Sequence, residues 1–147
     1  MSAAELEGGD WIRGITIRQP WATCILAGKR TENRPKPWSW RGWVLLHAGK
    51  ARPEPTVLRD PLVATAIRSR ELHLGAVIGV ARLIDCHLDL GPERCTSPWA
   101  QREAHHLVLA DVHVLPLPVP ASGALPAWKP TRDLVDQVLQ QLPHLRP

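Results

Sequence analysis

The chain has 147 residues, a formal net charge of +4, and three cysteines that form no CxxC pair. This length can bury the core of one domain without cross-links, and the cysteines indicate neither a disulfide framework nor a thiolate zinc site. No apolar run approaches the ~20 residues that span a bilayer, and the start of the chain is acidic rather than basic. We therefore expect a cytoplasmic protein that is not exported and does not enter a membrane.

Charge is unevenly distributed along the sequence. Residues 1–10 carry a net charge of −3, residues 11–70 carry +9, and residues 71–147 carry −2. We expect residues 1–10 to form a loose acidic tail and residues 11–147 to form a single domain. A local excess of positive charge is typical of a surface that attracts phosphates, although a solvated basic face with no partner has the same composition.

The first predicted element is a strand at residues 14–18, where β-branched side chains alternate. Pro20 suits the first turn of a helix that ends near Gly28, and a charged, extended segment follows it. The apolar run at residues 43–48 predicts a strand that is buried on both faces. The first third of the chain thus alternates extended and helical segments.

Further along, Asp60 is a good N-cap with Pro61 at the first helical position, so we expect a helix that reaches about Arg70. The remaining predicted elements are, in chain order, a strand at 75–85 bent at Gly79, a strand or bent pair at 106–115, a proline-rich edge segment, and a final helix capped by Thr131. This order lacks the regular alternation of a doubly wound fold. It favours an α+β, mostly β fold: a small, curved, mostly antiparallel barrel with helices at its ends.

The segment from Lys29 to Arg34 is the most informative part of the sequence, because it places a lysine, a glutamate and an arginine within six residues. On an extended chain Glu32 and Arg34 face the same way, and Lys29 lies at the turn into this segment. A carboxylate between two cations holds them in place, and the cations can bind phosphate while the carboxylate accepts from a base amino group. The alternative is an ion-pair network that only orders the chain.

Tryptophans flank this segment on both sides. Trp21 precedes it, and Trp38 and Trp40 follow it and share a face if Ser39 is extended. Indoles in these places can sandwich a nucleobase, each stack contributing roughly 1–3 kcal/mol. For each of them it is equally open that the indole fills the hydrophobic core instead, because the chain has no phenylalanine or tyrosine to do so.

The other aromatic residues are assigned by their context. Trp11 and Trp43 lie beside or inside apolar runs, and we assign them to packing. Trp99 and Trp128 lie in loop-like stretches that contain proline, and they either rim a cleft or pack against the core. His47, at the end of an apolar strand, is a candidate base or phosphate ligand, although a histidine in such a place is more often structural.

No pattern in the sequence points to a metal or a cofactor. His105 and His106 are neighbours and cannot face the same side of a strand, and neither has a spaced carboxylate or third ligand. The sequence also has no Gly-x-Ser-x-Gly, Walker loop or glycine-rich dinucleotide motif. We therefore expect no metal and no cofactor, and the common hydrolase, kinase and dehydrogenase classes are disfavoured.

The pattern Lys29-x-x-Glu32-x-Arg34 resembles the signature of the ASCH domain, a member of the PUA-like superfamily. The flanking segments that share the likeness are 17–22, 41–42 and 46–49. The resemblance runs from about Gly14 to Trp128 and implies a β-barrel of five or six strands with a cleft near the first helix, used for RNA, other nucleic acids or nucleotide-like ligands. Ala27 replaces the signature's first glycine, which affects the geometry of the turn.

The resemblance also implies an enzymatic branch of that family. Its members are amidohydrolases that deacetylate acetylcytidine, using a lysine and a threonine three residues later. Lys29 matches the lysine, but Glu32 stands where the threonine would be. Because of this departure, the resemblance assigns the role of the threonine to no residue of this chain. The enzymatic alternative is therefore a nucleoside amidohydrolase or a ribonuclease in which Lys29 is a base or nucleophile and Glu32 assists proton transfer.

Together these observations predict a domain that binds single-stranded RNA or DNA, or a modified base or nucleotide within it, in a basic cleft. The expected phosphate contacts are Arg18, Lys29, Arg30, Arg34, Arg41 and His47. The residues expected to read polar base edges are Gln19, Glu32 and Asn33, and those expected to stack on bases are Trp21, Trp38 and Trp40. Oligomeric state is not constrained by the sequence.

Overall fold

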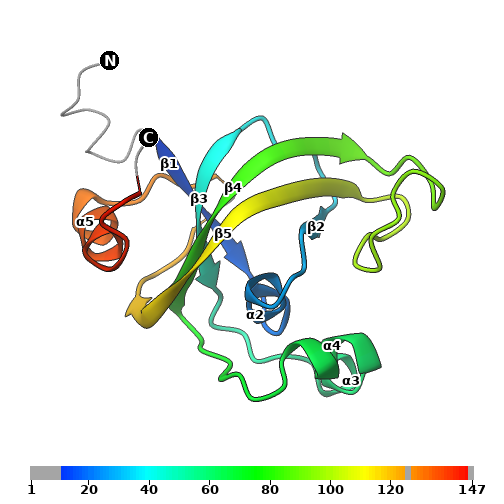
Figure 1. Ribbon diagram of the computed structural model, residues 1–147, viewed down its shortest axis with the longest axis horizontal. Helices are drawn as coiled ribbons and strands as arrows, with labels where there is room; N and C mark the ends of the chain where they lie inside the picture. Colours follow the sequence, from blue (N-terminus) through cyan, green and yellow to red (C-terminus); the bar gives the residue numbers. More distant parts are fainter. Residues whose placement is uncertain (1–10, 125–126, 146–147) are drawn as a thin grey trace.

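The computed structural model describes residues 11–124 and 127–145. The elements follow one another in the order β1 (Ile12–Ile17), α2 (Trp21–Leu26), β2 (Thr31–Arg34), β3 (Gly42–Ala48), α3 (Pro55–Leu58), α4 (Pro61–Ala66), β4 (Ala76–Leu88), β5 (His105–Pro120) and α5 (Arg132–Gln141) (Figure 1). The acidic tail predicted for residues 1–10 lies outside the described residues.

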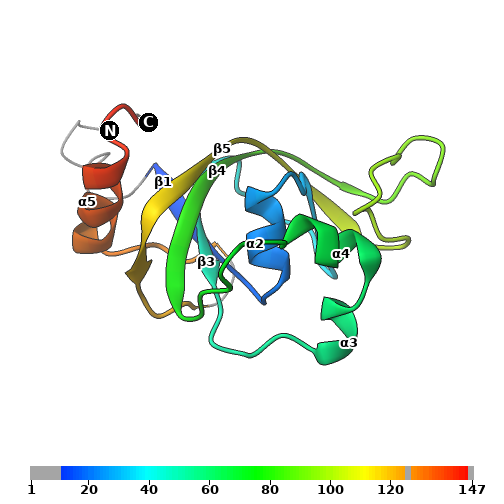
Figure 2. The ribbon, with the colours of Figure 1, turned by 60° about the horizontal axis from the view of Figure 1, so that its bottom comes forward.

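The strands form one sheet in the order β1-β3-β4-β5-β2. The pair β1/β3 is parallel and the other three pairs are antiparallel. Figures 1 and 2 show the long strands β4 and β5 bending together, so that the sheet curls around α2. The prediction of an α+β, mostly β and mostly antiparallel fold with five strands is confirmed.

The predicted closure of the sheet into a barrel is wrong, because the sheet is a curled half-barrel. The free edge of β1 is occupied by another segment: Gly14 donates its N–H to the carbonyl of Trp128 at 2.7 Å. A Cβ on Gly14 would lie 2.0 Å from the Trp128 ring, so only glycine allows this approach. At the other edge, β2 has four residues and pairs only with β5. The two edge strands β1 and β2 therefore do not pair with each other.

Most predicted helices are present with their expected caps. The Asp60 side chain accepts from the N–H groups of Leu62 and Val63, and Pro61 opens α4. This helix ends at Ala66, sooner than predicted, since its exposed face has little to pack against. The predicted Thr131 cap of α5 is also present, because the side chain accepts from Leu134 N–H. The short helix α3 was not predicted.

In the long antiparallel pair, β5 extends beyond its predicted bounds at both ends, and β4 begins at Ala76 and runs past its predicted end to Leu88. The register of the pair shifts near Gly79, where a Cβ would lie 2.8 Å from the His113 carbonyl oxygen. The predicted bend at this glycine is therefore confirmed. Residues 116–120 of the proline-rich segment form the last part of β5, and the Gln141 side chain bonds both backbone groups of Leu117 there.

Two hydrophobic clusters stabilise the curl. The first lies around α2, inside the concave face, and its buried members include Ile15, Ile17, Ala22, Ile25, Leu46 and Leu107. The second lies where α5 packs on the far end of the sheet, and its members include Trp11, Trp43, Leu45, Leu134, Val135 and Val138. Both Trp11 and Trp43 are buried, in agreement with their assignment to packing. Because α2 sits within the curl, the chain leaving it enters the open end of the half-barrel.

Cys24, on the buried side of α2, provides a test of this packing. All three cysteines are free, and burial raises the pKa of the Cys24 thiol to about 11, although the nearby Lys29 opposes the shift. A raised thiol pKa stabilises the fold below the ordinary value near pH 8.5, and this stabilisation is lost as the pH rises toward 11. Wild type should lose stability relative to Cys24→Ala over that window in thermal unfolding. Parallel curves would contradict the packing of this thiol.

Candidate functional site

Lys29, Glu32 and Arg34 form one ion-pair network at the open end of the half-barrel. Lys29 Nζ donates to Glu32 Oε1 at 2.6 Å, and Arg34 Nη2 lies 3.1 Å from Glu32 Oε2. Arg34 Nη2 also donates to the Thr16 carbonyl oxygen on β1 at 2.9 Å. The side chain of Lys29 is 2% exposed and that of Glu32 is 9% exposed. Both oxygens of the carboxylate are therefore engaged by cations in a largely dry environment.

The local backbone explains how these side chains meet. The N–H of Lys29 donates to the carbonyl of Cys24. This hydrogen bond turns the chain back at the end of α2. Gly28 takes a φ of +123° at this turn, a conformation that suits glycine. Glu32 and Arg34 then lie two residues apart on β2, so they point to the same side. The structure thus brings together the three residues of the predicted motif.

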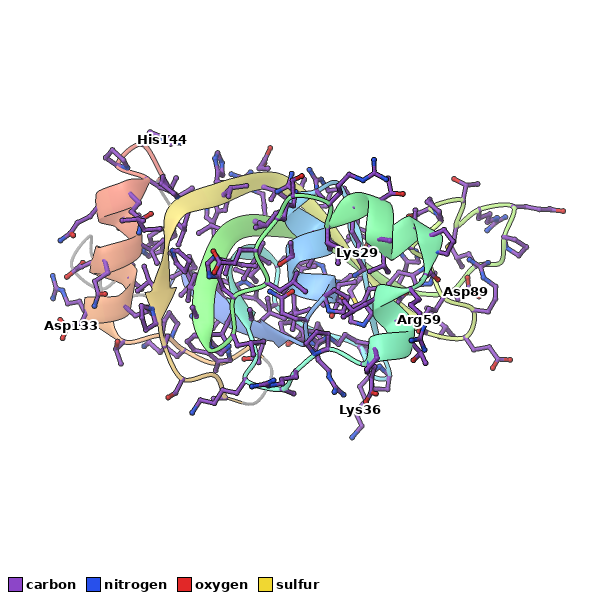
Figure 3. All side chains as sticks on the ribbon, turned by 90° about the horizontal axis from the view of Figure 1, so that it is seen from below. Lys29, Lys36, Arg59, Asp89, Asp133 and His144 are labelled. Carbon is purple, nitrogen blue, oxygen red and sulfur yellow. The ribbon has the colours of Figure 1, made fainter. Side chains whose placement is uncertain are left out.

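A pocket with a volume of about 210 Å³ lies beside this network. Its walls come from α2, β2, the start of α4 and the β4–β5 connection, and they include Trp21, Lys29, Glu32, Asn33, Asp60, Trp99 and Gln101. Figure 3 shows Lys29 in the middle of this side of the molecule, with Lys36, Arg59 and Asp89 toward the same end. Among the described residues that line it, Lys29 is the cation and Glu32 and Asp60 are the acids.

Two indoles form an aromatic corner of the pocket. The rings of Trp21 and Trp99 meet edge to face, with centroids 6.5 Å apart and an interplanar angle of 87°. Lys29 Nζ lies 5.9 Å from the Trp21 ring centroid, within the range of a cation–π contact. Perpendicular indoles cannot sandwich one flat ligand between parallel faces. They can offer one stacking face and one edge contact to the same ligand.

Asn33 joins the pocket to the connection between β4 and β5. Its Nδ2 donates to the Trp99 carbonyl oxygen at 2.8 Å, and its Oδ1 accepts from the Gln101 N–H at 3.0 Å. The side chain therefore positions the segment that carries Trp99. Asn33 lines the pocket, but its amide is already engaged on both sides, so it reaches a ligand mainly through the loop it anchors.

Several predicted binding residues lie elsewhere in the structure. Arg18 is exposed and bonds the Arg52 carbonyl and the Glu54 carboxylate. Gln19 is buried, with Nε2 bonded to the His73 carbonyl and Oε1 to the Thr23 N–H. Each is satisfied by contacts that order the chain around α2, and neither lines the pocket.

His47 also lies away from the pocket. Its Nε2 donates to the Ala121 carbonyl oxygen at 2.6 Å, which leaves Nδ1 to accept from the Thr16 hydroxyl at 3.2 Å. Trp128 Nε1 in turn donates to that hydroxyl and its ring meets the His47 ring edge to face. This chain of bonds links β1, β3 and the Trp128 segment, which is a structural role.

The residues that flank the motif on its far side form a separate group. Trp38 is buried in the α2 cluster, and Trp40 packs against Arg13 while its Nε1 donates to the Trp43 carbonyl. Arg41 donates to the carbonyl groups of Trp38 and Trp40. The remaining predicted cation, Arg30, follows Lys29 in the chain and is exposed. It donates to the carbonyl of Ile25, in the last turn of α2. None of these side chains lines the pocket.

Asp60 and Gln101 were not predicted as site residues, and Trp99 was left open between rim and core. All three reach the pocket through long-range contacts: α4 and the β4–β5 connection fold over the end of α2. The only signal in the sequence was an indole in a proline-containing loop. That signal cannot be separated from packing without knowing that the loop returns to β2.

Comparison with known proteins adds no assignment: the chain matches no protein-family model and no curated protein. Within the described residues, no helix is long and apolar enough to cross a membrane.

Proposed function

We propose that this chain is a binding domain of the ASCH type, in the PUA-like superfamily, whose pocket takes up one unpaired base of single-stranded RNA or DNA, or a free nucleoside. The observation that carries the proposal is the buried Lys29–Glu32 pair facing a pocket walled by Trp21 and Trp99. The signature spacing, the curled five-stranded sheet and the position of the pocket beside α2 agree with the family resemblance.

The size and chemistry of the pocket favour a single base. A volume of about 210 Å³ corresponds to roughly seven water molecules, enough for one heterocycle and too little for a stacked strand. An ammonium has three donors, and Lys29 gives one to Glu32, so the remaining donors are suited to a base carbonyl or ring nitrogen. The Glu32 carboxylate accepts from an exocyclic amino group, and an indole supplies the stacking face.

Phosphates would remain outside the pocket. Lys36 and Arg59 are exposed at the same end of the molecule as Lys29 (Figure 3), and Arg30, the next residue after Lys29, is also exposed. These are the cations that a nucleic-acid backbone would meet. The buried cations of the network would then hold Glu32 rather than bind phosphate. The predicted division of roles thus changes: exposed basic residues supply salt-dependent attraction, and the network supplies base recognition.

Fluorescence anisotropy of a short labelled single-stranded RNA, and of the DNA of the same sequence, tests this proposal. We expect saturable binding whose constant falls linearly with salt on logarithmic axes, with a slope of about 0.7 for each phosphate neutralised. A blunt duplex of the same length should bind more weakly, because its bases are paired. Absence of binding to both strands, and of tryptophan quenching by free nucleosides, would contradict the proposal.

The alternative is a hydrolase acting on nucleosides or RNA. The specific observation in its favour is the 2.6 Å contact between Lys29 Nζ and Glu32 Oε1, a distance at which a proton can pass between them beside the pocket. Incubation with N-acylated nucleosides and with RNA, followed by chromatography, separates the two functions. A binding domain returns these compounds unchanged. An enzyme forms product, and Glu32→Gln abolishes its formation.

A further inference from the structure

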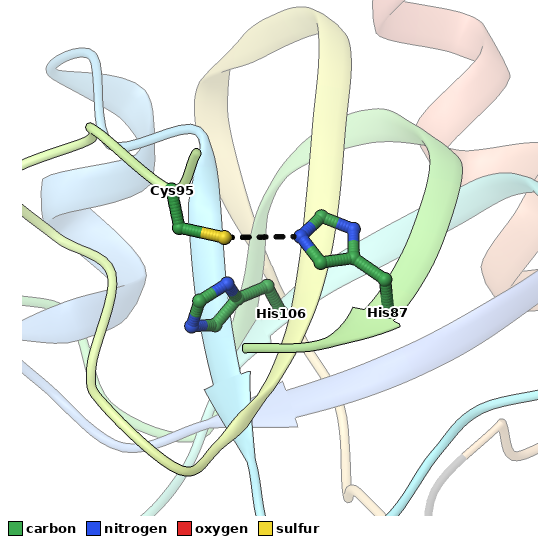
Figure 4. A group of neighbouring side chains, drawn as sticks. All are labelled: His87, Cys95 and His106. Atoms are coloured by element: carbon green, nitrogen blue, oxygen red, sulfur yellow. Dashed lines mark hydrogen bonds between the residues drawn. The ribbon is translucent and has the colours of Figure 1, made fainter. Parts of the chain in front are cut away.

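A second group of side chains lies at the base of the β4–β5 connection, outside the pocket. His87 comes from β4, Cys95 from the connection and His106 from β5, and one potential ligand atom of each lies within 4.8 Å of the other two. Figure 4 shows the Cys95 sulfur directed toward both imidazole rings. His106 is buried, and the other two residues are partly buried. No part of the proposed function uses these residues.

The tautomer of His87 is fixed by a carboxylate. His87 Nδ1 lies 2.7 Å from Asp85 Oδ2, so its proton is donated there. The lone pair of His87 is then on Nε2, which lies 3.5 Å from Cys95 Sγ. A carboxylate that orients a histidine in this way is the usual outer partner of a histidine that binds a metal.

The tautomer of His106 is also fixed by a hydrogen bond, in this case to a backbone carbonyl oxygen. His106 Nε2 lies 2.7 Å from the Gln101 carbonyl oxygen, which can only accept, so Nε2 carries the proton. The lone pair is then on Nδ1, and Figure 4 shows the ring of His106 close beneath the Cys95 sulfur. The two imidazole rings meet edge to face with centroids 5.3 Å apart. Both histidines thus offer lone pairs to the same small volume.

Cys95 supplies the third donor, a sulfur that lies between the two strands. The backbone N–H of Leu90 approaches Sγ at 3.5 Å. In a tetrahedral zinc site with a sulfur at 2.3 Å and nitrogens at 2.0–2.1 Å, the sulfur and each nitrogen are about 3.5 Å apart. The observed Sγ–Nε2 separation of 3.5 Å to His87 already matches that spacing. The ligand atom of His106 lies within 4.8 Å of both of these atoms.

We propose that His87, Cys95 and His106 bind one zinc ion, with the fourth position open to water or to a ligand. Two imidazoles and one thiolate form a donor set that suits zinc and its spectroscopic substitute cobalt(II), and does not suit calcium or magnesium. A nucleophilic Cys95 activated by His87 would need no third donor. The convergence of His106 on the same sulfur therefore favours the metal.

Binding at this site would also affect the pocket. Cys95 lies within the connection that carries Trp99 and Gln101, and His106 Nε2 is bonded to the carbonyl of Gln101. A metal that ties Cys95 to β4 and β5 fixes this connection at its middle and at both of its ends. We expect zinc to raise the thermal unfolding midpoint and to protect the amides of residues 95–101 from hydrogen exchange.

Titration of the reduced, chelator-treated full chain with cobalt(II) tests the site directly. We expect one equivalent to give an ultraviolet thiolate-to-cobalt charge-transfer band and visible bands of tetrahedral intensity, both displaced by one equivalent of zinc. Cys95→Ser should abolish the charge-transfer band, and His106→Asn should greatly weaken binding. Asp85→Asn, which removes a positioning residue, should weaken zinc binding about 10–100-fold.

Matched controls are available beside the site. His105→Asn changes the neighbouring histidine on the opposite face of β5, and Cys86→Ser changes the neighbouring cysteine of β4; both should retain the cobalt spectrum of wild type. Wild-type protein with no charge-transfer band at stoichiometric cobalt would overturn the proposal without reference to any variant. A band that survives in Cys95→Ser, or rapid alkylation of Cys95 that zinc does not slow, would also overturn it.

Discussion

Replacing Glu32 with glutamine should lower the free energy of unfolding by about 3–5 kcal/mol, because it removes the carboxylate from two cations that have little access to water. Lys29 would keep a charge that is 2% exposed, and Arg34 would lose its contact at 3.1 Å. Chemical denaturation of wild type and variant measures the loss. This loss measures the cost of leaving a buried cation without its partner. It does not measure the net contribution of the intact ion pair to stability.

The order of the related variants makes this prediction specific. Lys29→Met should cost less than Glu32→Gln, since Glu32 keeps Arg34 as a partner. Adding Lys29→Met to Glu32→Gln should recover part of the lost stability, because the double variant has no unpaired buried ammonium. Lys36→Met, at an exposed lysine, should change stability by no more than about 0.5 kcal/mol. Equal effects at Lys29 and Lys36 would contradict the network.

Replacing Trp99 with alanine should weaken binding of a single-stranded oligonucleotide by roughly 5–150-fold. The loss corresponds to the 1–3 kcal/mol that one base–aromatic stack contributes. Trp99 lies on the β4–β5 connection, where its ring meets that of Trp21, and it belongs to neither hydrophobic cluster, so its removal should leave both clusters in place. Anisotropy titrations at one fixed salt concentration measure the change.

Trp40→Ala is the matched control for this variant. Trp40 is partly buried like Trp99 and, unlike Trp99, was predicted to stack on bases, but it packs on Arg13 and does not line the pocket. It should bind the oligonucleotide as wild type does. If Trp40→Ala loses affinity and Trp99→Ala does not, the binding surface lies on the other side of the motif.

The elements that could be predicted were those determined by local sequence. Helix α4 is specified by Asp60 and Pro61, and the network by the spacing of Lys29, Glu32 and Arg34. These features follow from caps and from the period of a strand, which need no knowledge of distant residues. The general fold class followed from the order of the elements.

The features that could not be predicted depend on segments far apart in the chain. The half-barrel stays open because Trp128 occupies the edge of β1, more than a hundred residues from Gly14 in sequence. The side chains of Trp99 and Gln101 reach the pocket because Asn33 holds their loop against β2. Sequence spacing gives no distance between such segments.

The histidine–cysteine cluster illustrates the same limit. His105 and His106 are successive residues of β5 and point to opposite faces, so the pair alone indicates no site. The two further donors come from the adjacent strand and the connecting loop, because His87 pairs with His106 in the β4/β5 register. A prediction would have required that register in advance.

The most direct test of the base-binding pocket is a titration of nitrogen-15-labelled protein with a short single-stranded RNA, followed through the indole N–H signals of its seven tryptophans. Binding in the pocket should shift the signals of Trp21 and Trp99 most, and leave those of Trp11 and Trp43 nearly unchanged. Shifts concentrated on Trp40 or Trp128, or no shifts at saturating RNA, would contradict the assignment of the pocket.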